Sequence, residues 1–208
     1  MNTTLAAGPV GPLTTGTLIT GRAGQLGEFI VSELHGRDYE TNFRGNMFYG
    51  SLQAATALSV ALATTYTGLC LSNPAGNTKN LTLKKVTFAL TVAPAAIASI
   101  GLIGGYNVAG VTVHTTPLAS PAIGANVLGS AAMPTAKVDA ACTLVGTPFW
   151  MAQILGGFTA ASLPAGGPAM MDWDGSIIIQ PGGYVAIGAL TAVTGLASMF
   201  WEETPQAI

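Results

Sequence analysis

Apolar runs alternate with turn residues in the C-terminal stretch Gly175–Glu203, GSIIIQPGGYVAIGALTAVTGLASMFWEE. Its runs of β-branched and aromatic residues are separated by segments rich in Gly, Pro and Thr, which are typical of turns between short strands. The stretch therefore predicts strand, turn, strand, turn, strand, with Glu202 and Glu203 ending the last strand in solvent.

A second alternation runs from Leu52 to Leu62, where the large residues occupy even positions and small or polar residues the odd ones. This period of two is typical of a half-buried strand. The segment is rich in Ala, so a helix is the alternative, with Leu58 and Leu62 four residues apart. We favour the strand because TTYTGLCLSN follows without a helix stop signal.

Two more strands are predicted on either side of the turn Asn73-Pro74-Ala75-Gly76-Asn77, within LCLSNPAGNTKNLTLKKVTFAL. In the second of them Leu81 and Leu83 share one parity, whereas Val86 and Phe88 share the other. The phase changes at Lys84-Lys85. A β-bulge at this point would restore the faces and place one or both lysines in solvent.

The segment between Ala93 and Ala141 predicts long connections, with weak strands at Ile100–Ile103 and Val111–Thr115. Thr147–Gly157 has helix punctuation, with Thr147 as N-cap, Pro148 at the first position and Gly156 at the end, and predicts one short helix. No strand–helix alternation indicates a parallel sheet. We therefore expect an all-β, antiparallel two-sheet sandwich, with a jelly roll as the leading topology.

The charge distribution divides the chain. Charged residues make up 8% of the 208 residues, against about 25% in ordinary domains, and seven of the sixteen lie between residues 22 and 44. Residues 1 to 20, with GPVGP and many Thr, predict an extended arm, and one strand-like run follows at Phe29–Leu34. We assign residues 1–46 to an arm and charged junction, and 47–208 to the sandwich.

Low charge also bears on partners. A surface so poor in charge favours association, and we expect a homo-oligomer, a trimer, with most self-contact within residues 47–208. The net charge of −2 gives no reason to expect nucleic acid as a partner. The uncharged stretch Val86–Gly105 contains Pro94 and several Gly, so no membrane span is expected.

An interface needs directional groups, and this chain concentrates them in one place. The predicted subunit contacts are the charged residues of the junction: Arg22, Glu28, Glu33, Arg37, Asp38, Glu40 and Arg44. The arginines are the expected anchors because their planar forks match carboxylates. The alternative is that these charges only keep a linker solvated, since exposed ion pairs contribute little.

No motif indicates catalysis. The glycines of GRAGQLG fit neither a dinucleotide fingerprint nor a P-loop, and no Ser/His/Asp set has local support. His35 and His114 lack a Cys/His cluster or a His-Glu-x-x-His motif, so neither a metal site nor a cofactor is expected. Cys70 and Cys142 have no metal spacing and are interpreted as reduced core thiols. We expect a non-enzymatic protein.

One pattern fits a different class of function. Asp172 and Asp174 flank Trp173, and two carboxylates beside an aromatic ring can indicate a carbohydrate site or calcium ligands. This carbohydrate-binding module is the alternative of another class. The favoured interpretation is a polar turn before a strand, with Trp173 packed inward.

Taken together, the arm, the junction GEFIVSELHGRDYETNFRGN and a sandwich closing with IIIQPGGYVAIGAL and SMFWEE resemble bacteriophage virion structural proteins. The resemblance is to jelly-roll decoration (cement) proteins and to head or tail fibre proteins. It implies assembly in the host cytoplasm, location in the virion, and binding to the major capsid protein or other virion subunits. Capsid decoration that stabilises the shell is the leading expectation, and a fibre, tail or receptor-binding component is the alternative.

Overall fold

The computed structural model describes residues 38–106, 113–158 and 169–206. Within them lie one short helix, α1 (Tyr39–Phe43), and twelve strands: β1 (Met47–Ser51), β2 (Thr56–Ala57), β3 (Thr65–Ser72), β4 (Lys79–Val92), β5 (Ala98–Tyr106), β6 (Val113–Pro117), β7 (Ile123–Ala125), β8 (Lys137–Thr143), β9 (Phe149–Phe158), β10 (Ala169–Ile179), β11 (Gly183–Ala189) and β12 (Thr194–Pro205). No helix in these residues has the length and apolar character needed to span a membrane.

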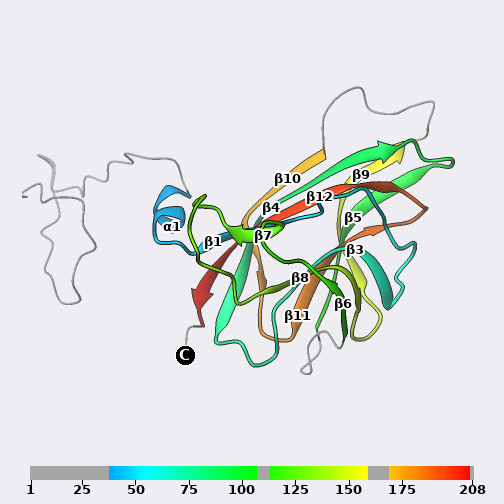
Figure 1. The fold of residues 1–208 in the computed structure, drawn as a ribbon. Coiled ribbons are helices and arrows are strands. Elements are labelled where there is room, and N and C mark those ends of the chain that lie inside the picture. Colours follow the sequence, from blue (N-terminus) through cyan, green and yellow to red (C-terminus); the bar gives the residue numbers. More distant parts are fainter. Residues whose placement is uncertain (1–37, 107–112, 159–168, 207–208) are drawn as a thin grey trace, which may run out of the picture. The chain divides into compact units, whose positions relative to one another are not determined.

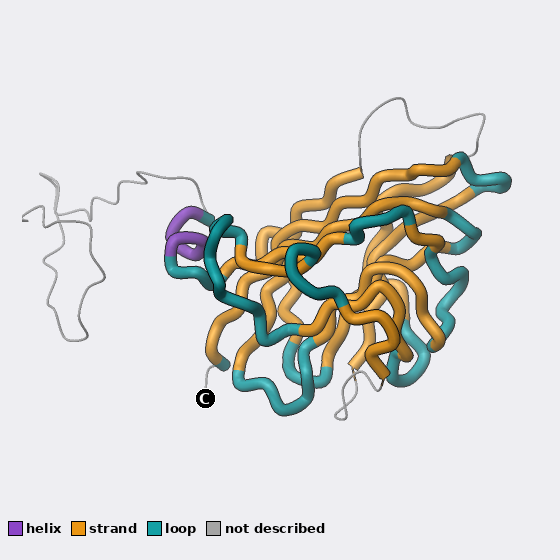
Figure 2. The backbone as a smooth tube through the Cα atoms, viewed as in Figure 1, coloured by secondary structure: helices purple, strands orange, loops and turns teal. Residues whose placement is uncertain are grey.

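The strands form two six-stranded sheets that pack as a sandwich (Figures 1 and 2). The first sheet has the order β10-β4-β12-β1-β7, with β2 paired to β12, and the second has the order β6-β8-β3-β11-β5-β9. Every ladder between these strands is antiparallel. The expected all-β, two-sheet sandwich is confirmed.

The connections follow jelly-roll order. From β1 the chain alternates between the sheets through β3, β4 and β5, and after β9 it alternates again through β10, β11 and β12. Among the eight strands β1, β3, β4, β5, β9, β10, β11 and β12, only the step from β5 to β9 stays within one sheet. As a result β10-β4-β12-β1 faces β9-β5-β11-β3, which is the paired Greek-key arrangement of a jelly roll.

An insertion between β5 and β9 extends both sheets beyond this frame. Its strands β6 and β8 continue the second sheet past β3, and β7 continues the first sheet past β1. All three additions lie on the β1/β3 flank of the sandwich. The opposite flank ends at β9 and β10, which contact each other across the two sheets.

Side chains from both sheets fill the space between them. The core includes Phe88, Leu102 and Trp201, all at most 1% exposed, and the ring of Trp201 stacks on Phe48 with centroids 6.2 Å apart. In β12 the inward positions are Ala197, Met199 and Trp201. The predicted succession of strand, turn, strand, turn, strand in this stretch is confirmed by β10, β11 and β12.

The phase change in β4 is a β-bulge, as predicted. Phe200 pairs with Lys85 and Trp201 with Leu83, which leaves Lys84 as the extra residue. Both lysines are only partly exposed. Lys84 Nζ lies 3.0 Å from Glu202 Oε2 at a side-chain exposure of 18%, so this lysine is paired with a carboxylate instead of being released into solvent.

Two sequence predictions of secondary structure were wrong. Residues 52–62 form a strand only at Thr56–Ala57, because this segment crosses from β1 in the first sheet to β3 in the second. Thr147–Gly157 is not a helix but contributes most of β9, which pairs with β5. Tertiary pairing thus overrides local helix punctuation, and the one short helix of the described residues is α1.

Glycines of the second sheet explain part of this pairing. A Cβ at Gly101 or Gly188 would meet the ring of Trp150 from β9, and a Cβ at Gly105 would meet the ring of Tyr184. Aromatic rings therefore lie directly against glycine backbone on this sheet. They help form a second, smaller apolar cluster apart from the inter-sheet core, centred on Tyr66, Cys70, Ile103, Cys142, Leu144, Tyr184 and Ala186.

Among the described residues the first strand begins at Met47, and Glu40–Ile208 form one compact unit. The arm and the run Phe29–Leu34 lie outside the described residues. The boundary near residue 46 stays a prediction.

Candidate functional site

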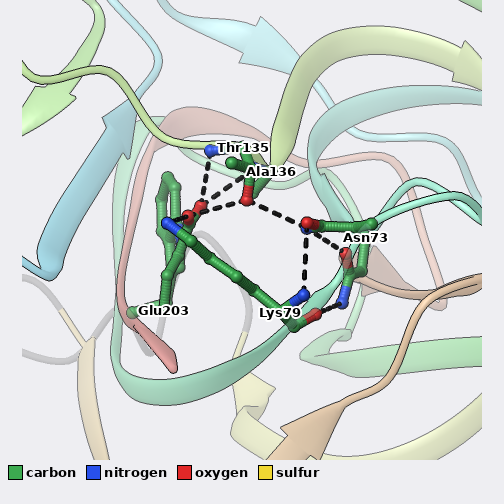
Figure 3. Close-up of polar contacts among 7 residues, drawn as sticks. Asn73, Lys79, Thr135, Ala136 and Glu203 are labelled. Carbon is green, nitrogen blue, oxygen red and sulfur yellow. Dashed lines mark hydrogen bonds and ion pairs between the residues drawn. The ribbon is translucent and has the colours of Figure 1, made fainter. Parts of the chain in front are cut away.

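The buried carboxylate of Glu203 is the centre of a polar cluster at one end of the sandwich (Figure 3). Glu203 Oε1 accepts hydrogen bonds from the backbone N–H groups of Thr135 (2.8 Å) and Ala136 (2.9 Å). Oε2 accepts from the Thr135 hydroxyl (2.7 Å) and pairs with Lys79 Nζ at 3.1 Å. The prediction that Glu203 ends the strand in solvent is wrong, since its side chain is fully buried.

Two asparagines extend this cluster. Asn73 Nδ2 donates to the carbonyls of Lys79 and Ile179, both at 2.9 Å. Asn77 Nδ2 donates to Asn73 Oδ1 (2.7 Å) and to Thr135 Oγ1 (2.9 Å). The predicted turn at residues 73–77 therefore connects through side chains to the segment before β8 and to β12.

The electrostatics of the cluster are those of a structural clamp. Burial alone would raise the pKa of Glu203, but the hydrogen bonds from Ala136 and Thr135 and the contact with Lys79 outweigh it and lower the pKa. A carboxylate held ionised by so many donors is a weak base. Its chemistry is to fix the segment before β8 against β12.

A second buried carboxylate belongs to Asp139 in β8. Its Oδ2 lies 2.7 Å from Nδ1 of His114 in the neighbouring edge strand β6, and the Asp139 side chain is fully buried while that of His114 is 35% exposed. Burial raises the pKa of Asp139, and the hydrogen bond and charge of His114, together with the charge of Lys137, oppose that rise. The pair joins β6 to β8.

His114 lies opposite Cys142 in the ladder, yet the arrangement is not a nucleophile–base pair. Cys142 is 2% exposed, and His114 makes no hydrogen bond to a thiol or hydroxyl among the described residues. His35 lies outside these residues. Nor do the described His, Cys, Asp and Glu side chains include a group of three that could hold a metal ion.

Both cysteines are buried free thiols, as the sequence indicated. The pKa of Cys70 is raised well above its usual value, mainly by a hydrogen bond with Cys142 and secondly by burial. The pKa of Tyr66 is likewise raised, mainly by burial and secondly by the nearby thiols. Its hydroxyl donates a hydrogen bond to the Ile187 carbonyl at 2.6 Å. These groups pack together in the smaller apolar cluster.

Asp172, Trp173 and Asp174 do not converge on one site. The two carboxylates lie on exposed positions of β10, whereas Trp173 is partly buried and packs against the inter-sheet core, as expected. The polar turn lies within the strand, not before it. It is an irregular excursion in the β10–β4 pairing between Asp172 and Ile177. An inward indole cannot serve as an exposed sugar platform.

Most of the residues predicted to make subunit contacts lie outside the described residues. Arg22, Glu28, Glu33 and Arg37 lie beyond the described residues, and Asp38, Glu40 and Arg44 lie in or beside α1. Arg44 Nε and Glu40 Oε1 are 2.7 Å apart, with side-chain exposures of 67% and 64%. Arg44 and Glu40 thus form an exposed i,i+4 pair. The contact role of the whole set stays a prediction.

The candidate functional site is an apolar surface at the β9/β10 flank, which sequence reasoning missed. Tyr106, Phe149, Met151 and Ile178 are 62%, 55%, 40% and 59% exposed, and they border a hollow of about 200 Å³. We call these four residues and the hollow the seam surface. Its described lining has no charged residue: Gly105, Tyr106, Phe149, Met151, Ile177, Ile178, Ile179, Gln180, Gly183, Tyr184 and Val185.

One signal in the sequence could have revealed part of this surface. Three consecutive isoleucines, Ile177, Ile178 and Ile179, cannot all face the core of a strand, because successive side chains point to opposite faces. The middle residue is the exposed one. Tyr106 and Phe149 gave no comparable signal, since they meet only through the pairing of β5 with β9.

A scan against protein-family models, a search of curated proteins and a search of solved structures find no match to this chain.

Proposed function

We propose that this chain is a non-enzymatic structural subunit of a bacteriophage virion, and specifically a capsid decoration protein that binds and stabilises the shell. The observation that carries the proposal is the seam surface, an uncharged apolar patch on a chain with 8% charged residues. Such a surface is more stable when it is buried against another protein subunit than when it is exposed to water. The jelly-roll topology supports the proposal because this architecture recurs in viral capsid domains.

The described ionisable groups support a structural role as well. Glu203 and Asp139 are each held by partners that join neighbouring segments, and the thiols are buried in an apolar cluster. These contacts stabilise the fold and present no reactive group to a substrate. A head or tail fibre component remains the alternative within the same class.

The test is a census of intact particles by mass spectrometry and electron microscopy. A decoration protein is expected in many copies distributed over the shell, whereas a tail or tail-fibre part is expected in few copies at one vertex. Absence of the chain from purified particles would overturn the proposal.

The attachment site is tested separately with particles that lack the protein. The Arg37→Ala, Arg44→Ala double variant should bind these particles with lower occupancy, and wild-type binding should weaken with added salt. Unchanged occupancy across a salt series would exclude the junction as the contact zone. The oligomeric mass of the variant serves as the control for folding.

A further inference from the structure

We infer that the seam surface is an interface between copies of this chain, in which an aromatic side chain of one copy enters the hollow of its neighbour. This inference rests on the proposed structural role, and it names the surface and the partner. The surface lies where the edge strands of the two sheets, β9 and β10, run beside each other.

Size is the first argument. At exposed fractions of 40% to 62%, four residues of this kind present on the order of 500 Å². A standard interface buries about 800 Å² on each partner. The seam surface therefore supplies more than half of the area that a stable pair of subunits needs, before its flanking residues are added.

The shape of the hollow argues for a side chain as its occupant. Its volume of about 200 Å³ is below the roughly 300–1,000 Å³ that is usual for small-molecule sites. Aromatic anchors that fill small pockets dominate the binding energy of protein interfaces. Tyr106 and Phe149 stand on the rim of the hollow, so each copy of the chain carries both the pocket and the anchor.

The absence of charge in the described lining of the hollow favours a second copy of this chain as the partner. None of the described lining residues is charged, so a contact between two seam surfaces buries no unpaired charge and avoids its desolvation cost. A charged peptide or a phosphate would find no complementary group on this surface.

The backbone of the two edge strands argues against strand addition. In β10 the pairing with β4 is interrupted between Asp172 and Ile177, where Asp174 and Gly175 have φ of 50° and 79°. The pairing of β9 with β5 is interrupted by three register shifts. Irregular edges of this kind block continuation of a sheet. The neighbour therefore docks through side chains, which gives a finite oligomer instead of an extended ladder.

The test is sedimentation over a concentration series with the Tyr106→Thr, Phe149→Thr double variant. Threonine retains β propensity at both strand positions. The dissociation constant should rise at least about 30-fold, because loss of an anchor usually has at least this effect. The matched control is Ile97→Thr, Leu128→Thr, which removes two apolar side chains that are 66% and 86% exposed away from the hollow. The control should associate like the wild type.

A second measurement does not depend on the stability of the variant. A photo-crosslinking phenylalanine analogue at position 149, in a mixture of isotopically light and heavy chains, should crosslink between copies to residues 177–180 or 183–185. Crosslinks to residues 1–37 of another copy would instead identify the arm as the occupant and overturn the inference.

Other outcomes also decide the question. The inference is wrong if the wild type is a monomer at all concentrations, if the double variant associates normally, or if the control dissociates equally. None of these results changes the particle census. A chain found on particles without self-association through the seam surface would retain the proposed function and lose this interface.

Discussion

Replacing Glu203 with Gln tests the buried clamp most directly. The substitution keeps the shape of the side chain but removes the charge that pairs with Lys79. It also replaces one carboxylate oxygen with an NH₂ group, which must face either the backbone N–H groups of Thr135 and Ala136 or the ammonium group of Lys79. Breaking a buried pair from one side costs roughly 3–5 kcal/mol. Because Lys79 is 34% exposed and can be partly rehydrated, we expect a loss of about 3 kcal/mol in the free energy of unfolding.

The assay is urea unfolding followed by tryptophan fluorescence, since Trp201 is buried and lies two residues from the substituted position. The control is Glu40→Gln, which breaks an exposed pair and should cost about 0.5 kcal/mol or less. A Glu203→Gln variant within about 0.5 kcal/mol of the wild type would refute the assignment of the cluster as a stabilising clamp.

The pH dependence gives an independent check. The pKa of Glu203 is lowered in the folded protein, from about 4.3 in an unfolded chain. Its ionised form is therefore favoured by folding, and this stabilisation is complete above pH of about 4.3. It is lost as the pH falls through the lower folded pKa. The stability difference between the wild type and Glu203→Gln should stay constant from neutral pH to about 4.3 and shrink below that.

Three further predictions follow from packing and burial. Gly101→Ala should lower the free energy of unfolding by about 1–3 kcal/mol, because the new Cβ would meet the Ala152 carbonyl and the Trp150 ring. The control Gly76→Ala has open space around its Cβ, so it should change the free energy of unfolding by less than about 1 kcal/mol in the same assay. His114→Ala should raise the pKa of Asp139 further, because it removes the group that opposes the effect of burial; a fall in that pKa in a carboxyl ¹³C NMR titration would contradict this. Cys70 and Cys142 should be inert to a thiol reagent at pH 8 in the folded protein and react only in denaturant, since both are buried and the pKa of Cys70 is raised; rapid reaction without denaturant would exclude the buried thiol cluster.

The local pattern of apolar and polar residues was sufficient to predict strands that turn one face toward the core. The strand–turn succession of the closing stretch and the phase change at Lys84 are properties of neighbouring residues, so the sequence shows them without knowledge of the fold. The segment 52–62 has the same parity but serves as a connection between sheets. Leu52 and Leu58 of this segment are buried. The alternating pattern therefore reflects burial of these side chains and not the pairing of a long strand.

The sites were much less predictable. Glu203 reaches Thr135 and Lys79 across 68 and 124 sequence positions, and no local feature of a terminal Glu-Glu pair indicates those partners. The same holds for His114 and Asp139, which meet only because the insertion places β6 beside β8. The seam surface likewise depends on how two edge strands from different sheets come together.

The position of β12 has a consequence for how this protein is made. This strand lies between β4 and β1 in the centre of the first sheet, although it is the last of the described strands in chain order. At roughly 5–20 residues per second, the ribosome needs on the order of 10–30 s between β1 and β12. Until β12 has been made, β1 and β4 lack the strand that lies between them in the sheet. The first sheet can therefore be completed only after β12 has been translated, and the strand edges that β12 joins are open to incorrect pairing until that moment.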